Sequence, residues 1–369
     1  MERWKIFSLV VLAVAVALSC WSHSLVLQEF YMPTFGNTGM HAAPAREFAE
    51  TGFYPRVDYY SYGGGIPFLY VPLYRVLVGA SVILAGVSVE AASRLGVMVV
   101  GALSPLAFFA LARKMFGERA GLFAAFLSLL PAELLIYTVR PLPQAVGMLL
   151  VPLALLAVLE RKWVASLLLA AVVALTHQET ALFLAGGLFL YGVFALASSL
   201  GLKGELGEKR EAKRSAREGG LLALCCWGVL VLSYFAWQFA VVGHLNVFAT
   251  NQFAQHEGVP VGFGEVASQS GVVLLALFFC GVAFLAGRVL MRWKRGEKQL
   301  FGESELLALA LVLAGVALVK NDWLGLRVLM QRFIVYLDEA MVLVAAFGAE
   351  RVFSFLAGGG WRKSVAGIA

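Results

Sequence analysis

GNTGMHAAPAREFAETGFYPRVDYYSYGGGIP, residues 36–67, makes up most of a polar island, residues 21–65, in an otherwise apolar sequence. It follows the first hydrophobic segment and combines aromatic residues and glycines with charged side chains. Because charge is scarce in this chain, a long loop that keeps it is the first place to expect binding or catalysis. The alternative is that the loop is polar only because it is solvated. The stretch carries His41, Arg46, Glu47, Glu50 and Asp58.

The composition indicates a membrane protein. Of the 369 residues, 60% are hydrophobic and 14% are charged, and the mean hydropathy is +0.82. Such a chain has too little polar surface to cover a water-soluble globule. A membrane-spanning helix needs about 20 apolar residues. We therefore predict an all-α polytopic helical bundle in the cell membrane, with about ten transmembrane helices in a single integral domain, residues 1–369.

Charge and cysteine content exclude several other classes of protein. The net charge of +6 does not indicate nucleic-acid binding, because the basic residues fall in short loops between hydrophobic runs, as membrane topology requires. The cysteines lie in or at the end of apolar segments, without the spacing of a zinc site or a disulfide framework. They are Cys20, Cys225, Cys226 and Cys280.

The distribution of Lys and Arg predicts the orientation. The first apolar run follows Arg3 and Lys5, so we expect it to be the first transmembrane helix with a cytoplasmic N-terminus. Residues 66–88 are also apolar. If they do not cross, most of the 29 Lys and Arg residues lie on the cytoplasmic side, whereas a single crossing there would reverse this bias. We therefore predict an interfacial or re-entrant helix with Pro67, Pro72 and Arg75 at the membrane surface. The alternative is a true span offset by a missed one.

Nine further spans complete the prediction and make both termini cytoplasmic. Residues 21–91 then form the first external loop, which carries the juxtamembrane helices. Residues 201–218 form a charged cytoplasmic connector, either a solvated linker or a segment that binds anionic lipid headgroups. The expected spans are residues 92–112, 119–138, 144–159, 163–178, 181–200, 219–243, 269–290, 304–320 and 329–350.

This topology brings polar residues from distant parts of the sequence to the external side. Arg140 lies between two predicted spans, His177 and Glu179 lie at the next external turn, and Arg332 lies near the start of the last span. Arginine at this depth suits a lipid-linked phosphate, because guanidinium groups pair with phosphate oxygens. The alternative is that each basic side chain only extends to water.

Two carboxylates are expected inside the last span. Asp338 and Glu339 cost about 2.5–3.5 kcal/mol each at mid-membrane on insertion scales, so they should face the bundle interior or a wet cavity. Arg332 and Glu339 are seven residues apart, which places both on one face of a continuous helix. We expect them to interact through Tyr336 or water, in a structural network or in a binding site.

Several motifs, in order, resemble the GT-C superfamily of integral membrane glycosyltransferases. They are a first span, an external loop of the form D-x-x-x-H…A-R…G…P, a G-x-P-x-x-Y-x-P-L juxtamembrane helix and an A-R-K-M-F-G cytoplasmic turn. THQET, residues 176–180, is similar to a turn of prokaryotic members. The other segments are GNTGMHAAPAREFAETGFYP (36–55), GGGIPFLYVPLYRVLVG (63–79), ASRLGVMVVGALSPL (92–106) and LARKMFGERAG (111–121).

The resemblance implies transfer of a sugar from a polyprenyl-phosphate-linked donor to an acceptor glycan, lipid or protein outside the cytoplasm. An acidic residue of the first external loop would act as the base or hold a divalent metal. The usual Asp of the motif, four residues before the His, is Asn37 here, and an amide cannot take up a proton. Asp58, among tyrosines that suit a sugar face, is the best substitute. His41 is a second candidate base or a phosphate ligand, and Asn37 would position the substrate.

Three functions follow from these patterns. The first is a glycosyltransferase in which Asp58, His41 and Asn37 form the catalytic group, while Arg140, His177, Glu179 and Arg332 bind the donor. The second is a non-catalytic protein of the same fold that binds a lipid-linked glycan or scaffolds a partner. The third is a transporter or flippase with Arg332, Asp338 and Glu339 in a wet pathway.

Overall fold

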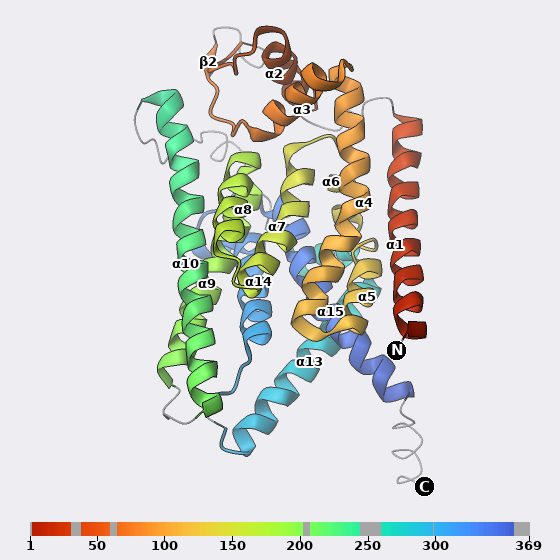
Figure 1. The fold of residues 1–369 in the computed structure, drawn as a ribbon, viewed down its shortest axis with the longest axis vertical. Helices are drawn as coiled ribbons and strands as arrows, with labels where there is room; N and C mark the ends of the chain where they lie inside the picture. The colour runs from red at the N-terminus through yellow and green to blue at the C-terminus, as the bar shows by residue number, and fades with distance from the viewer. Residues whose placement is uncertain are drawn as a thin grey trace.

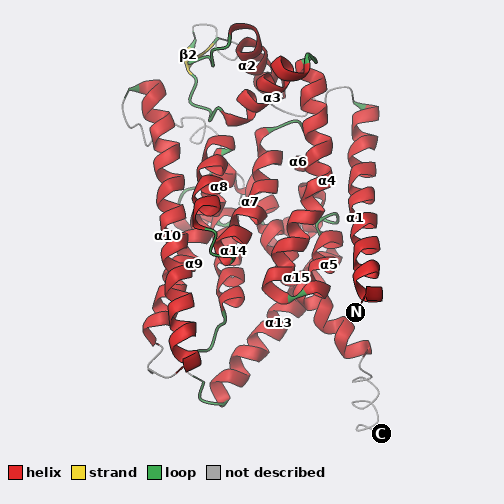
Figure 2. Cartoon of the chain, viewed as in Figure 1, coloured by secondary structure: helices red, strands yellow, loops and turns green. Residues whose placement is uncertain are grey.

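The computed structural model describes residues 2–30, 38–59, 65–201, 207–243, 260–297 and 299–357. These residues are almost all helical, with one antiparallel pair of two-residue strands (Figure 2). The predicted all-α class is therefore confirmed. The elements up to α6 are α1 (Glu2–Glu29), α2 (Thr38–Thr51), β1 (Val57–Asp58), β2 (Ile66–Pro67), α3 (Leu73–Ala85), α4 (Val89–Phe116), α5 (Glu118–Leu127) and α6 (Ala132–Thr138).

The second half of the chain continues the bundle. Its helices are α7 (Pro143–Leu159), α8 (Trp163–Thr176), α9 (Gln178–Gly201), α10 (Gly207–Val242), α12 (Phe263–Ser270), α13 (Val272–Lys294), α14 (Glu303–Val319) and α15 (Ile334–Ala357). Two 3-10 turns, η1 (Asn321–Leu324) and η2 (Met330–Phe333), join α14 to α15.

Six helices in the described ranges are long and apolar enough to cross a membrane, so the chain is a multi-pass membrane protein. The six spans lie in α1, α4, α9, α10, α13 and the segment that ends with α15. A seventh span arises if α5 and α6, which meet at a 75° bend, are counted as one. Pro131 is the N-cap residue of α6, and a proline cannot continue a preceding helix. The shorter helices α7, α8 and α14 occupy three of the other predicted spans, and a total of ten crossings stays a prediction.

The last helix is the centre of the bundle. Every residue of α15 from Ile334 to Ala349 is buried, and α5, α13 and α14 pack around it (Figure 1). A helix that is apolar on all sides belongs in the interior. Asp338 and Glu339 therefore face the inside of the bundle, as expected.

A small cap covers one end of the bundle. It consists of α2, the β1–β2 pair and α3, which lie together beyond the ends of α7 and α8 (Figure 1). Helix α2 packs closely on α3 at Gly79, where an added Cβ would lie 2.7 Å from the carbonyl oxygen of Ala45. The cap contacts α4 through Tyr74, Val78 and Val89.

The position of residues 66–88 agrees with one part of the prediction and contradicts another. Helix α3 has 13 residues, so it is about 20 Å long and too short to cross about 30 Å of hydrocarbon. Its place in the cap agrees with the prediction that this segment does not cross. The predicted surface position of Arg75 is wrong, because its side chain is completely buried. The stretch from Phe68 to Tyr70 folds over the guanidinium and shields it from solvent.

The charged connector is largely part of a helix. Residues 207–218 form the first three turns of α10. Arg161, from the turn between α7 and α8, donates to the Ser215 carbonyl and pairs with Glu303 at the start of α14. These contacts tie three segments together at the end of the bundle opposite the cap (Figure 1).

Candidate functional site

The candidate site lies where the cap meets the ends of α8, α9 and α15. The Tyr70 ring of the cap contacts the His41 ring, with centroids 4.9 Å apart, and the His177 ring of the bundle, at 6.2 Å. Two predicted site residues from distant parts of the sequence are therefore linked through one aromatic ring. The cap is held on the bundle by Gln238 of α10, whose side-chain amide donates to the Leu69 carbonyl at 2.8 Å.

Arg75 is the central cation of the cap. Its Nε donates to His41 Nδ1 at 3.1 Å, and its Nη1 donates to the Tyr54 hydroxyl at 2.7 Å. The guanidinium carbon lies 4.2 Å from the centre of the Phe68 ring and 4.5 Å from that of Tyr70, within the range of cation–π attraction. Both hydrogen-bond partners are uncharged side chains, so these bonds hold the cation without neutralising it.

Two buried donors beside Tyr54 make no hydrogen bond to any described residue. They are Nη2 of Arg75 and the indole nitrogen of Trp237, and the Trp237 ring packs edge-on against Tyr54 with centroids 5.6 Å apart. A buried donor left unpaired costs about 1–3 kcal/mol, and more when it is charged. An anionic ligand with oxygen acceptors matches this pair of donors.

His41 is held as a neutral donor. Arginine has only N–H donors, so His41 Nδ1 accepts the bond from Arg75 and the neutral ring carries its proton on Nε2. Burial holds the pKa of His41 well below its usual value, and the positive charge of Arg75 lowers it further. In this geometry His41 does not have a free ring lone pair for a base, and its other ring nitrogen is an N–H donor.

Asp58 lies in the same cap. It ends β1 opposite Ile66 of β2, and its side chain is buried. Burial raises the pKa of the Tyr54 hydroxyl, Arg75 opposes this rise, and the charge of Asp58 adds to it. The Asp58 carboxylate is therefore close enough to raise the pKa of Tyr54, the tyrosine that binds Arg75.

A hydrogen-bonded cluster positions His177 at the top of the bundle. Thr180 donates its backbone N–H to His177 Nδ1 at 3.3 Å, and its hydroxyl lies 2.9 Å from the same atom. The Tyr336 hydroxyl of α15 lies 3.0 Å from the Thr180 hydroxyl and 3.2 Å from His177 Nδ1. Phe183 stacks on Tyr336 and completes the packing. These contacts fix His177 Nδ1 as an acceptor, so its other nitrogen carries the proton.

The remaining donor-binding candidates surround Tyr137. Arg332 pairs with the buried Glu179 at 3.4 Å, and its own side chain is 43% exposed, so it is accessible to a ligand. Arg332 lies in η2, outside the helix that carries Glu339, and its ion pair is with Glu179. The guanidinium of Arg140 lies 5.2 Å from the centre of the Tyr137 ring. Glu179, Arg140 and Arg332 all act electrostatically on Tyr137.

The structure brings two groups of predicted residues together. His41 and Asp58 lie in the cap, while His177, Glu179, Arg140 and Arg332 lie at the bundle end beneath it. Asn37 lies outside the described residues. The sequence analysis did not identify Arg75, Tyr54 and Trp237 as parts of the site. A signal for Arg75 was present, since it is the one charged residue among the apolar residues 66–88.

The described residues do not fit a divalent metal. Nowhere in the described ranges do three or more His, Cys, Asp or Glu side chains come together as possible ligands. The arrangement instead gathers guanidinium, imidazole, indole and hydroxyl donors around the cap.

Comparison with known proteins identifies the fold. No protein-family model matches the chain, and no curated protein matches it in sequence. Solved structures do match. One is the oligosaccharyltransferase AglB from Archaeoglobus fulgidus in complex with an inhibitory peptide and a dolichol-phosphate. Its TM-score is 0.64 at 16% identity, with 100% of this chain and 53% of that chain covered.

Two further structures give the same result. ArnT from Cupriavidus metallidurans, bound to undecaprenyl phosphate, has a TM-score of 0.60 at 16% identity, covering 95% of this chain and 61% of that chain. The Archaeoglobus fulgidus oligosaccharyltransferase in complex with Zn and sulfate has a TM-score of 0.59 at 14% identity, covering 94% of this chain and 49% of that chain. The chain spans about half to three-fifths of the length of these proteins. Over nearly its whole length, it has the fold of the GT-C membrane glycosyltransferases.

Proposed function

We propose that the chain is a membrane glycosyltransferase that takes a sugar from a lipid-linked phosphate donor at the external face of the membrane. The observation that carries this proposal is the buried Arg75, which has two uncharged partners and an unpaired Nη2. The indole N–H of Trp237, which packs on the same tyrosine, is also unpaired among the described residues. Proteins of this fold are described with a bound dolichol-phosphate and a bound undecaprenyl phosphate. A phosphate on a membrane lipid is the anion that we assign to these donors.

In this proposal the residues of the bundle beneath the cap also bind the donor phosphate. Arg332 is half exposed and tethered by Glu179, so its guanidinium stays in place while it contacts phosphate oxygens. Arg140 adds positive charge over Tyr137, and His177 offers its second nitrogen as a donor. Guanidinium groups pair with phosphate oxygens through two parallel hydrogen bonds, which fixes orientation as well as charge.

The chemistry is a displacement at the anomeric carbon. The acceptor nucleophile forms a bond to that carbon, the bond to the phosphate oxygen breaks, and the lipid phosphate leaves with the electron pair. Donors already aimed at the phosphate stabilise the charge that develops on it. Asp58 takes the proton of the acceptor. His41 and Asn37 orient the substrates, since the neutral His41 presents an N–H and Asn37 an amide.

The proposal also includes the membrane topology and the class of acceptor. The chain crosses the membrane ten times with both termini in the cytoplasm, which places the cap on the external side. The acceptor is a glycan, lipid or protein on that side. These statements rest on the distribution of Lys and Arg and on the cap position at one end of the bundle.

The test separates binding from transfer. Lipid-linked glycans are compared by mass spectrometry in cells with the wild-type gene, without it and with Asp58→Asn, and binding of undecaprenyl phosphate is measured on each purified protein. We expect the wild type to change the glycan profile, and Asp58→Asn to bind the lipid but leave the profile as in cells without the gene. An unchanged profile with wild-type protein present would contradict the proposal.

A second candidate function is a non-catalytic protein of this fold that binds a lipid-linked glycan. Asn37 favours it, because Asn stands where the resembled motif has Asp. In that case wild-type protein binds undecaprenyl phosphate without changing the glycan profile. A gain of transfer on Asn37→Asp would identify a decayed catalytic site.

A further inference from the structure

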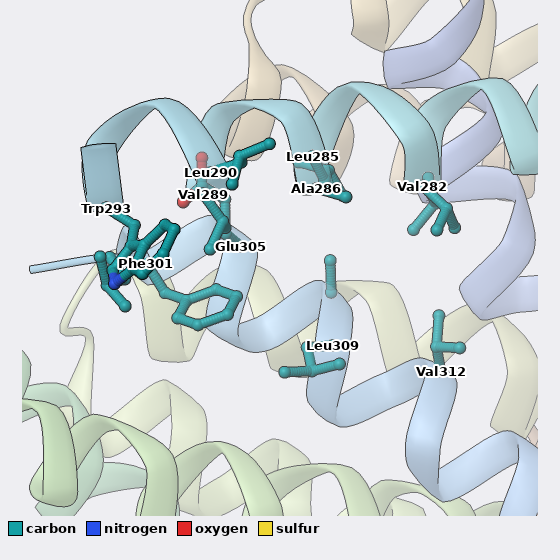
Figure 3. Close-up of a pocket in the computed structure, with 13 residues that line it drawn as sticks. Val282, Leu285, Ala286, Val289, Leu290, Trp293, Phe301, Glu305, Leu309 and Val312 are labelled. Atoms are coloured by element: carbon teal, nitrogen blue, oxygen red, sulfur yellow. The ribbon is translucent and has the colours of Figure 1, made fainter. Parts of the chain in front are cut away.

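An apolar groove lies between α13 and α14 at the end of the bundle opposite the cap. Its volume is about 520 Å³, within the ~300–1,000 Å³ range of small-molecule sites. Side chains of both helices point into the space between them, with Ala286 and Val282 on α13 and Leu309 and Val312 on α14 (Figure 3). Val344 of α15 also lines the groove.

The groove opens to the lipid side of the bundle. Leu290, Trp293 and Leu309 line it and are 48%, 65% and 37% exposed, although they are large apolar side chains on or beside candidate membrane spans. In a membrane, such exposure means contact with hydrocarbon. The groove is therefore a slot that a hydrocarbon chain can enter from the bilayer.

The arginines around Glu305, at one end of the groove, outnumber the carboxylates that pair with them. The one charged lining residue is Glu305, whose carboxylate accepts from Arg292 Nη1 at 2.6 Å and from the Gly302 backbone N–H at 2.7 Å. Arg288 Nη1 lies 3.4 Å from the other carboxylate oxygen, so two guanidiniums share one carboxylate.

A third arginine, Arg351, lies next to Arg288. Arg288 and Arg351 lie over one ring, Phe347, with guanidinium carbons 5.4 Å and 5.0 Å from its centre. Arg351 is paired with Glu350 at 3.2 Å, so each carboxylate in this cluster is matched and one arginine charge is left over. Lys294, in the last turn of α13, adds further positive charge at this end.

We propose that this groove is a binding site for an anionic phospholipid. One acyl chain lies between α13 and α14, and the phosphate of the headgroup meets the guanidinium of Arg288, which is 38% exposed. Basic pockets between transmembrane helices are suited to anionic headgroups, and the apolar walls supply the affinity for the chain. A zwitterionic lipid offers the same chain without the net negative charge, so the cluster should favour the anionic lipid. The site is independent of the proposed glycosyl transfer.

The test uses the full chain in nanodiscs with equal amounts of palmitoyl-oleoyl phosphatidylglycerol and palmitoyl-oleoyl phosphatidylcholine, two lipids with the same acyl chains. Lipid that stays bound after ejection from the disc is identified by native mass spectrometry. We expect the wild type to retain phosphatidylglycerol over phosphatidylcholine by about fivefold or more. Arg288→Gln should remove most of this preference.

Two groove-filling variants test the position of the chain. Ala286→Phe on α13 and Leu309→Trp on α14 occupy the groove from opposite walls, and each should lower retention of phosphatidylglycerol severalfold. The matched control is Leu168→Phe on α8, which enlarges an exposed apolar side chain elsewhere in the bundle. Equal retention of the two lipids by the wild type would overturn the proposal. So would groove variants that retain as much phosphatidylglycerol as the control.

Discussion

At the scale of the residue, the site depends on one cation that the fold buries. Arg75 is held by hydrogen bonds to His41 and Tyr54 and by two aromatic faces, and its Nη2 remains unpaired among the described residues. Hydrogen bonds orient the guanidinium, and the rings keep water away from it. The cation is therefore preorganised for an anion, which is the main reason for assigning a lipid phosphate to the cap.

Replacing Arg75 should weaken binding of undecaprenyl phosphate. Loss of a charged hydrogen bond is worth about 1.5–3 kcal/mol, so Arg75→Gln should raise the Kd roughly 10- to 100-fold. Arg75→Lys should fall between this variant and the wild type, because lysine keeps the charge but not the planar fork. Arg46→Gln is the control, since Arg46 lies on the outside of the cap and pairs with Glu90. Equal effects of Arg46→Gln and Arg75→Gln on the Kd would contradict the assignment.

His41 should make the folded protein sensitive to acid. In the unfolded chain the imidazole takes up a proton below about pH 6.5, whereas burial and Arg75 keep it neutral in the fold to lower pH. Unfolding therefore binds a proton as the pH falls below 6.5, and the free energy of unfolding decreases. Thermal unfolding at pH 7.5 and pH 5.0 should show a smaller drop in Tm for His41→Gln than for the wild type. An identical drop would show that His41 is not held neutral.

At the scale of the element, close packing of the last two long spans depends on glycine. An added Cβ at Gly281 of α13 would lie 2.2 Å from the Val344 carbonyl oxygen, and one at Gly348 of α15 would lie 2.3 Å from that of Leu277. These distances are too short for any side chain, so the two backbones touch. Small residues permit such close approach between membrane helices.

A side chain at Gly281 should push α13 away from α15. We expect Gly281→Ala to destabilise the protein by about 1–3 kcal/mol, the usual cost of overpacking, and to lower its Tm by several degrees. Gly287→Ala on the same helix is the matched control, because nothing lies within 4 Å of an added Cβ there. The measurement is thermal unfolding in detergent. Equal Tm values for Gly281→Ala and Gly287→Ala would show that the contact between Gly281 and Val344 does not limit the packing of α13 on α15.

At the scale of the whole molecule, the two proposed sites lie at opposite ends of the bundle. The cap with Arg75 covers one end, and the groove with its arginine cluster lies at the other (Figure 1). The central helix α15 runs between these ends, fully buried for most of its length. The proposed orientation assigns the two ends to different sides of the membrane, with the cap outside.

Cysteine labelling tests this orientation. In a chain whose four native cysteines are replaced, Glu50→Cys in α2 and Lys213→Cys in α10 put single thiols on exposed positions at the two ends. A membrane-impermeant maleimide should label Glu50→Cys in intact cells and Lys213→Cys only after the membrane is permeabilised. Labelling of Lys213→Cys from outside would reverse the orientation and place the cap in the cytoplasm.

The sequence by itself determined the class of fold, because long apolar segments can only satisfy their backbone in a membrane as helices. It also identified the region of the cap, since charged and aromatic residues 36–67 stand out in so apolar a chain. The order of its motifs indicated the GT-C fold, which structural comparison confirmed. The ten crossings, the cytoplasmic termini and the roles of the site residues stay predictions.

Only the tertiary structure decided which side chains meet. Arg75 looked like a surface residue of an amphipathic helix, because the sequence does not show that Phe68 and Tyr70 fold back over it. The sequence spacing predicts contact between Arg332 and Glu339 through Tyr336 or water, whereas the ion pair of Arg332 is with Glu179, 153 residues away. Contacts between segments so far apart depend on how helices pack, and local periodicity carries no information about that packing.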